Sequence, residues 1–303
     1  MNQTRIRKAI IPAAGFGTRF LPITKTVPKE MLPVGDKPVI QYVVEEAVAA
    51  GLTEILIVIS RGKEAIPDYF ARNPELERRL EASGKAGLAA GLRRLSEMAR
   101  IHYIYQHEMK GLGHAVLQGR SFAGDEPFGL LLGDTFISPA KDPEAQSTTM
   151  TRLVETLNER KTSAVAVEPV SPERVARYGV AGGEEIKSGL FQVREMVEKP
   201  EPASAPLIRR LSDKNGSFCH YAFAARYVFT SGLFAELERT TPGKNGEIQL
   251  TDAMTALKEK EGFHAVELDG IRRDIGDPEG LRNALNSLRS ETAARLTNNQ
   301  SPP

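Results

Sequence analysis

The chain of 303 residues is predicted to fold as an α/β protein, with a doubly wound, mixed but mostly parallel sheet and helices on both faces. Two observations support this prediction. Residues 54–60 form a continuous apolar run of strand length, which is typical of a parallel strand covered on both faces. Such runs alternate with segments of helical spacing, beginning with residues 39–50. This alternation indicates βαβ units, in which helices pack against the sheet that the strands form.

The first half of the chain supplies these elements in order. Residues 8–12 are a short β-branched run and are expected to form the first strand. The helix over residues 39–50 should end at Gly51, which can adopt the left-handed conformation of a helix cap. After the strand at 54–60 we expect a helical segment over residues 75–100 with an interruption between Gly84 and Gly91. A strand over 101–105, a helix over 113–122 and a strand over 128–132 should follow.

Segments that can contact a ligand follow three of these predicted strands. Residues 13–19 follow the first strand, Gln106 follows the strand at 101–105, and Asp134 follows the strand at 128–132. Because ligands of doubly wound sheets bind beyond the carboxyl ends of the strands, we expect these three segments to converge. An aspartate has no packing reason to follow an apolar strand, so Asp134 is a candidate metal ligand, with a helix N-cap as the alternative.

The second half of the chain is mixed. Leu281, Leu285 and Leu288 share one face of a predicted last helix. That apolar face packs either on its own domain or on another subunit, and the sequence does not decide between the two. The elements expected in this half are strands over residues 163–167, 189–199, 221–229 and 263–268, and helices over 231–239, 249–261 and 279–296.

Composition and charge exclude several classes of protein. With 41% hydrophobic and 26% charged residues, the chain is not disordered as a whole. A formal net charge of +1 argues against a nucleic-acid partner. Cys219 is the only cysteine, so no intrachain disulfide can form, and we expect a reducing, cytoplasmic environment. The sequence has no apolar run as long as the roughly eighteen residues of a membrane span, so we expect no membrane insertion.

Residues 13–19, which read Ala-Ala-Gly-Phe-Gly-Thr-Arg, form a candidate phosphate-binding loop. Gly15 and Gly17 allow the backbone to turn sharply and to bring N–H groups against an anion. Arg19 and Lys29 add positive charge. The loop lacks the third glycine of a dinucleotide fingerprint and the Gly-Lys-Ser/Thr of a P-loop. A tight turn without a ligand is therefore the alternative interpretation.

The loop is followed by Pro28-Lys29-Glu30-Met31-Leu32-Pro33, and the compound pattern resembles the sugar-phosphate nucleotidylyltransferases. The resemblance covers about residues 6–282 and is strongest to the uridylyltransferase group of this family. It implies a Rossmann-like nucleotidyltransferase fold and Mg²⁺-dependent transfer of a uridylyl group from UTP to glucose 1-phosphate. UDP-glucose and pyrophosphate would form by in-line attack of the sugar phosphate on the α-phosphorus. The resemblance also implies a homo-oligomer, either a dimer or a tetramer.

The resemblance further implies which residues act in catalysis and which bind metal. Asp134 and Asp274 are implied as magnesium ligands. Asp277 competes with Asp274 for this role, although its position at the start of a predicted helix favours capping. The residues implied as catalytic are Arg19, Lys29 and Lys199.

Binding residues follow from the same resemblance. Residues 246–253 match a segment characteristic of the uridylyltransferase group, whose plain interpretation is a capped helix start, and Ala225 stands where relatives commonly carry glycine. The implied sugar-phosphate contacts are Gly179, Glu198 and Lys199. The implied nucleotide contacts are Ala13, Ala14, Gly15, Gly17, Thr18, Glu30, Gln106 and Gly111.

One catalytic domain over residues 1–282 is expected, with a nucleotide-binding part over about 1–135 and a sugar-phosphate-binding part over about 136–282. Residues 283–303 would form a C-terminal helix and tail that can contact another subunit. Three other functions remain open: thymidylyl transfer to glucose 1-phosphate, a non-catalytic regulatory subunit that binds nucleotide sugars, and an oxidoreductase. The missing third glycine disfavours the oxidoreductase. A regulatory subunit could lose the charged residues of the site, and this chain keeps Arg19, Lys29, Asp134 and Asp274.

Overall fold

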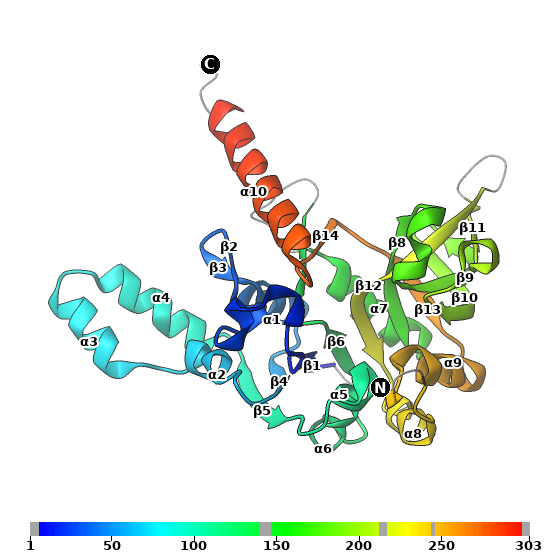
Figure 1. Cartoon of the computed structure of the whole chain (residues 1–303), viewed down its shortest axis with the longest axis horizontal. Coiled ribbons are helices and arrows are strands. Elements are labelled where there is room, and N and C mark those ends of the chain that lie inside the picture. The colour runs from blue at the N-terminus through cyan, green and yellow to red at the C-terminus, as the bar shows by residue number, and fades with distance from the viewer. Residues whose placement is uncertain (1–5, 140–146, 212–216, 244–245, 299–303) are drawn as a thin grey trace.

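The computed structural model describes residues 6–139, 147–211, 217–243 and 246–298 (Figure 1). Its centre is a ten-stranded mixed sheet with the order β11-β9-β10-β13-β8-β12-β6-β1-β4-β5, so the predicted α/β class is confirmed. The strands are β1 (Lys8–Pro12), β4 (Glu54–Ile59), β5 (Arg100–Tyr105), β6 (Phe128–Leu131), β8 (Ala164–Val170), β9 (Gly179–Lys187), β10 (Leu190–Glu198), β11 (Ile208–Arg209), β12 (Phe218–Phe229) and β13 (His264–Glu267).

The sheet is continuous across both halves of the chain. Strands β6, β1, β4 and β5 form a parallel block, as expected from the first half of the sequence. Strand β12 runs antiparallel to both β6 and β8 and so joins this block to the second half. There, β13 pairs in parallel with β8, while β10 runs antiparallel to β9 and β13. The carboxyl ends of β1, β5 and β6 therefore lie at one edge, where the predicted ligand-binding segments emerge.

Helices cover both faces of the sheet, which confirms the doubly wound arrangement. Ile10 of β1 belongs to an apolar cluster that α5, α8 and α9 cover, whereas Ile11 belongs to a second cluster that α1, α2 and α7 cover. The helices are α1 (Val39–Ala49), α2 (Ala65–Phe70), α3 (Pro74–Ala82), α4 (Ala86–Glu97), α5 (Gly111–Leu117), α6 (Arg120–Ala123), α7 (Thr149–Arg160), α8 (Gly232–Arg239), α9 (Leu250–Glu261) and α10 (Pro278–Asn298).

Two predicted boundaries are wrong. The single helix expected over residues 113–122 is divided into α5 and α6 near Gly119. This glycine lies against β1, since a methyl group added to it would stand 2.3 Å from Ile10 Cδ1. In the helical segment expected over residues 75–100, the only interruption lies at residues 83–85, between α3 and α4. The later glycines, Gly87 and Gly91, lie within α4 and do not end it. The α3–α4 pair projects from the body of the molecule (Figure 1).

Two short strands that the sequence did not indicate pair with each other just before the last helix, α10, and fix where this helix begins. Strand β7 (Thr135–Ser138) pairs antiparallel with β14 (Ile271–Asp274), and the register sets Asp274 opposite Thr135. A further small hairpin consists of β2 (Pro33–Val34) and β3 (Lys37–Pro38). The leucine face of α10 packs on its own domain, against a cluster that includes Phe136 and Ile275.

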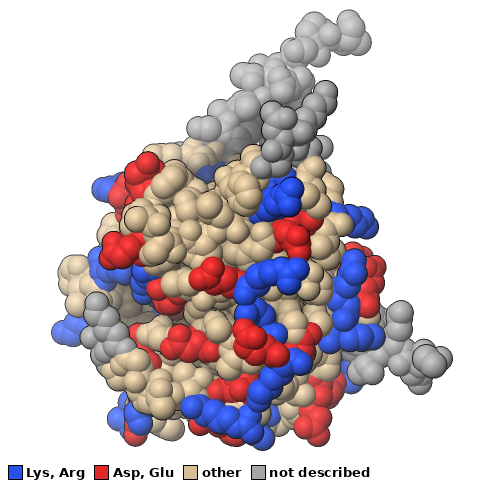
Figure 2. All heavy atoms as spheres, turned by 90° about the vertical axis from the view of Figure 1, so that its right-hand side faces the viewer, with Lys and Arg blue, Asp and Glu red and all other residues tan. Residues whose placement is uncertain are grey.

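The surface and the helices agree with the predicted charge and hydropathy. On the face shown in Figure 2, acidic and basic side chains are interspersed, in keeping with the net charge of +1. Of the helices in the described part of the chain, none combines the length and the apolar character needed to cross a membrane.

A buried ion pair ties the sheet to α1 and β7. Arg226 of β12 has no exposed surface, and its Nε and Nη2 donate to Glu46 Oε2 at 3.0 and 2.8 Å. Nη2 also donates to the carbonyl oxygen of Thr135 at 2.8 Å. Because removal of one partner leaves a buried charge uncompensated, this pair constrains the structure more than any surface pair does.

Glu46→Ala should therefore lower the free energy of unfolding by about 3–5 kcal/mol in urea titrations. Adding Arg226→Met should recover much of this loss, because the buried charge is then removed together with its partner. Glu81→Ala, which breaks an exposed pair with Arg93, should cost less than about 1 kcal/mol. Equal losses in Glu46→Ala and Glu81→Ala would contradict the importance of the buried pair.

Candidate active site

Two adjoining cavities lie along the carboxyl ends of β1, β5 and β6. The larger has a volume of about 670 Å³ and reaches across to β10, β12 and β14. The smaller, of about 310 Å³, lies between the loop after β1 and the start of α5. The residues that line both cavities, and so mark their junction, are Gly15, Lys29, Leu112, Leu132, Asp134 and Glu247.

The loop after β1 is held in a defined conformation. Ala13 N donates to Val58 O at 2.8 Å, which fixes the start of the loop to β4. Gly17 has a φ of 65°, in the left-handed region that favours glycine, and its carbonyl oxygen accepts from Thr24 Oγ1 at 2.8 Å. The glycine loop predicted from the sequence is therefore a turn held by hydrogen bonds, and its Gly15 lines both cavities.

Lys29 and Asp134 form an ion pair at the junction of the cavities. Burial alone would lower the pKa of Lys29, but the charges of Asp134 and Glu30 outweigh it and raise this pKa above its ordinary value. Burial would likewise raise the pKa of Asp134, and the ammonium of Lys29 reverses that effect and lowers it. Both groups are therefore charged at neutral pH.

Asp274 lies beside this pair. Strand β14 brings it opposite Thr135, and Ile275 N donates to Asp134 O at 3.0 Å. A methyl group added to Gly276 would stand 3.0 Å from Asp274 Oδ1, 3.7 Å from Arg19 Nη1 and 3.9 Å from Asp134 Oδ2. Two carboxylates and a guanidinium therefore surround one small space.

Asp134 and Asp274 provide the carboxylate oxygens that a hard divalent cation requires, although Asp274 Oδ1 here accepts from Gly276 N and Asp134 Oδ2 from Lys29 Nζ. Mg²⁺ takes one or two carboxylates and fills its other positions with phosphate oxygens and water. Within the described residues, no three His, Cys, Asp or Glu side chains gather into a larger metal-binding group. Asp277, the competing candidate, caps α10 instead, since its Oδ1 accepts from Gly280 N at 2.8 Å. The capping role predicted for Asp277 is thus confirmed.

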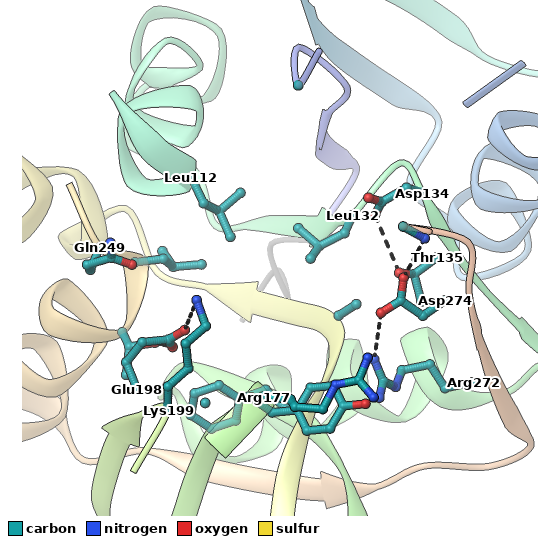
Figure 3. A pocket seen from close by; sticks show the side chains of 18 of the residues that line it. Leu112, Leu132, Asp134, Thr135, Arg177, Glu198, Lys199, Gln249, Arg272 and Asp274 are labelled. Atoms are coloured by element: carbon teal, nitrogen blue, oxygen red, sulfur yellow. Dashed lines mark hydrogen bonds and ion pairs between the residues drawn. The ribbon is translucent and has the colours of Figure 1, made fainter. Parts of the chain in front are cut away.

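The end of β10 contributes the opposite wall of the larger cavity, where Figure 3 shows Glu198 and Lys199. Glu198 Oε2 accepts from Thr251 Oγ1 at 2.7 Å, and Lys199 Nζ lies 3.6 Å from Glu198 Oε1. Gly179 is required by close packing, because a methyl group there would stand 2.4 Å from Phe223 Cδ2 and 3.0 Å from Glu198 Oε2.

Lys199 has an unusual backbone. Its φ of 48° lies in the left-handed region, which a lysine rarely occupies, and its N–H donates to Tyr178 O at 2.9 Å. Strain of this kind persists only where the surroundings impose it, and it clusters at functional sites.

The smaller cavity combines apolar and polar walls. Gln106 is 4% exposed, and its Nε2 lies 2.9 Å from His114 Nδ1, so the amide is held in place at the cavity wall. Glu30 also lines this cavity, but its carboxylate accepts from Lys63 Nζ at 2.6 Å beneath the loop. Burial raises the pKa of Glu30, and it lowers that of Lys63. The Glu30 carboxylate is thus held by Lys63 in a buried ion pair next to Lys29 in the sequence.

All residues predicted for the site line one or both cavities. The larger cavity includes Gly15, Gly17, Thr18, Arg19, Lys29, Asp134, Gly179, Glu198, Lys199 and Asp274. The smaller includes Ala13, Ala14, Gly15, Lys29, Glu30, Gln106, Gly111 and Asp134.

Sequence reasoning missed several lining residues, of which Arg272 is the most constrained. Its guanidinium lies 2.7 Å from Glu168, 3.5 Å from Asp274 and 4.7 Å from the ring centre of Tyr178. Arg177, also shown in Figure 3, lines the same cavity. The sequence marks these arginines only by position: Arg177 is two residues before Gly179, and Arg272 is two residues before Asp274. An isolated arginine carries no pattern that distinguishes it from a surface residue.

Ala225 occupies an irregular point of β12, where the register with β8 shifts between Phe223 and Tyr227. Its φ is 61°, and its carbonyl oxygen accepts from Leu132 N at 3.2 Å, beside the junction of the cavities. The left-handed backbone explains why glycine is the residue expected at this position.

The fold and the paired cavities define a nucleotidyltransferase, and comparison with known proteins agrees. The chain belongs to the nucleotidyl transferase family, whose model matches residues 8–291. It is 44% identical over 277 residues to the UTP–glucose-1-phosphate uridylyltransferase of Bacillus subtilis (strain 168), covering 91% of this chain and 89% of that protein.

Solved structures give the same result. A UDP-glucose pyrophosphorylase complexed with UDP-glucose has a TM-score of 0.80 and 38% identity, with 94% of this chain and 99% of that chain covered. The UTP-bound UGPase from Acinetobacter baumannii has a TM-score of 0.81 and 34% identity, with 93% of each chain covered. The predicted family and fold are thus confirmed.

Ala225→Gly should change the free energy of unfolding by less than about 1 kcal/mol. The substitution loses the burial of one methyl group and makes the unfolded chain more flexible, and both effects destabilise the protein. Relief of the left-handed backbone strain at this position offsets them. Ala224→Gly is the matched control, since Ala224 is equally buried and has no positive φ. It should cost about 1–2 kcal/mol in the same urea titration. A larger loss for Ala225→Gly than for Ala224→Gly would show that its backbone is unstrained.

Proposed function

We propose that the two cavities together hold UTP and glucose 1-phosphate for the transfer of a uridylyl group. The activity is that of a UTP:glucose-1-phosphate uridylyltransferase, which forms UDP-glucose and pyrophosphate. One observation supports the placement of the substrates: residues from six separate segments of the sequence line two cavities that meet at Lys29 and Asp134.

The chemistry needs charge neutralisation more than proton transfer. An oxygen of the sugar phosphate attacks the α-phosphorus of UTP, and the bond from that phosphorus to the bridging oxygen of the leaving pyrophosphate breaks. The attacking phosphate is already ionised at neutral pH, so no general base is required. Both substrates are anions, and catalysis therefore depends on positive groups that hold them together and in line.

The site supplies these positive groups from opposite sides. Arg19 faces the triphosphate from the loop after β1, Lys29 faces it from the short helical turn that follows this loop, and Lys199 faces the sugar phosphate from the end of β10. Glu198, held by Thr251, accepts hydrogen bonds from sugar hydroxyls beside Gly179. In this proposal the nucleotide-binding part lies within about residues 1–135 and the sugar-phosphate-binding part within about 136–282, with Glu247 of the second part also lining the smaller cavity.

The smaller cavity takes the base. Gln106 pairs with the uracil edge through its amide, while Ala13, Ala14 and Gly111 approach the base or ribose with backbone or small side chains. Thymine differs from uracil by one methyl group, whose burial is worth only about 1 kcal/mol. Burial of this methyl group alone therefore separates UTP from dTTP by no more than about tenfold in affinity.

Asp134 and Asp274 would hold Mg²⁺, since their carboxylates surround the space beside Gly276. Bound there, the ion would neutralise charge on the transferring phosphoryl group. The homo-oligomer implied by the resemblance stays a prediction, which sedimentation of the purified chain tests directly.

Asp134→Asn tests the metal site and the reaction together. With UTP, glucose 1-phosphate and Mg²⁺, the wild-type chain should release pyrophosphate, and Asp134→Asn should lower kcat by on the order of 100-fold or more. Asp277→Asn should keep near wild-type turnover, because Asp277 caps α10 through Oδ1 and lines neither cavity, and its Oδ2 makes only a long, 4.0 Å pair with Arg177 Nη2. Mn²⁺ binding, followed by electron paramagnetic resonance, should weaken in Asp134→Asn alone. Wild-type turnover by Asp134→Asn at saturating Mg²⁺ would contradict the metal assignment.

Lys199→Ala should raise the KM for glucose 1-phosphate by roughly 10- to 100-fold, because one charge-assisted hydrogen bond is lost. Binding of UTP alone, measured by calorimetry, should stay within about twofold. Lys161→Ala is the matched control, since Lys161 also has a left-handed φ, of 60°, but does not line either cavity. Equal losses of UTP and glucose 1-phosphate affinity would move Lys199 into the nucleotide site.

A further inference from the structure

Phe16 lies between the two glycines of the loop and lines the smaller cavity, yet it is 60% exposed. No aromatic ring in the described part of the chain stacks on it. A single exposed apolar side chain is common on a protein surface, but Phe16 is exposed on the wall of a cavity, where a bound ligand can cover it. The loop around Phe16 is fixed, because Ala13 is bonded to Val58 and Gly17 to Thr24.

The rest of the smaller cavity suits a flat ring. Its walls include Met109, Leu112, Ala115 and Leu132, which are apolar, while Gln106 provides the polar group. A pyrimidine has two apolar faces and one hydrogen-bonding edge. If its edge meets the amide and one face meets the apolar wall, the other face is left toward the loop and solvent.

We propose that the ring of Phe16 stacks on the base of bound UTP and covers the face that the cavity wall leaves open. This inference rests on the proposed placement of the nucleotide in the smaller cavity. Stacking on an aromatic side chain tolerates any base, because every base has a π-face. Phe16 therefore contributes affinity for the nucleotide, whereas selection among bases is left to the edge contact of Gln106.

The sequence offers a direct spectroscopic test, because it contains no tryptophan. In Phe16→Trp the new indole is the only one, and titration with UTP in the absence of glucose 1-phosphate should quench or shift its emission. Phe218→Trp is the matched control, since Phe218 is 62% exposed at the start of β12 and lines neither cavity. Its emission should not respond to UTP.

Kinetics test the same contact in the otherwise unchanged enzyme. Phe16→Ala should raise the KM for UTP on the order of tenfold, as expected for loss of one base–aromatic stack, with kcat and the KM for glucose 1-phosphate within about twofold. Phe16→Tyr should behave as wild type, and Phe16→Leu, which keeps apolar bulk without a ring, should fall between. Phe218→Ala should leave every constant unchanged.

The outcomes separate this inference from the proposed function. If UTP binds to Phe16→Trp by calorimetry but its emission does not change, or if Phe16→Leu matches wild type, the stacking role is overturned while the activity stands. If the wild-type chain itself neither binds UTP nor releases pyrophosphate, the proposed function fails. A response of equal size in Phe218→Trp would mean that the signal is not local to Phe16, and it too would overturn the inference.

Discussion

The ion pair between Lys29 and Asp134 is the constraint on which the active site depends. A site for two anionic substrates needs buried positive charge, and an unpaired buried ammonium would be costly before the substrates arrive. Asp134 meets this need, since it keeps Lys29 protonated while its own carboxylate stays ionised. The pair also lies where the two cavities meet, so the same two side chains line both the cavity proposed for the base and the larger cavity proposed to hold the sugar phosphate.

The scaffold holds this pair from both halves of the chain. Asp134 follows β6 of the parallel block, and Asp274 is brought beside it by the pairing of β14 with β7. Arg226, from β12, bonds the carbonyl oxygen of Thr135 directly after Asp134. Strand β12, which joins the two halves of the sheet, therefore also holds the candidate metal site. Its Arg226 bonds both to buried Glu46 and to the backbone next to Asp134.

Much of this arrangement could be predicted from the sequence because it depends on local patterns. Apolar runs in the sequence indicate the main strands. The alternation of strands and helices predicts that the loop after β1, Gln106 and Asp134 lie close together, and all three line the smaller cavity. Contacts between distant, short segments could not be predicted. Four-residue strands such as β14 have too few residues for periodicity to show, and the stack of Arg272 on Tyr178 has no sequence signature.

The division of labour in the site follows from the sizes of the energies involved. Charged contacts to phosphates are each worth on the order of 1.5–3 kcal/mol, and the proposed site provides several of them. A single methyl group on the base is worth about 1 kcal/mol, and stacking on Phe16 does not distinguish one base from another. We therefore infer that discrimination against bases with a different hydrogen-bonding edge, such as cytosine, comes from the edge proposed to meet Gln106, whose amide is held by His114. A misplaced amide would relax base choice while leaving phosphoryl chemistry intact.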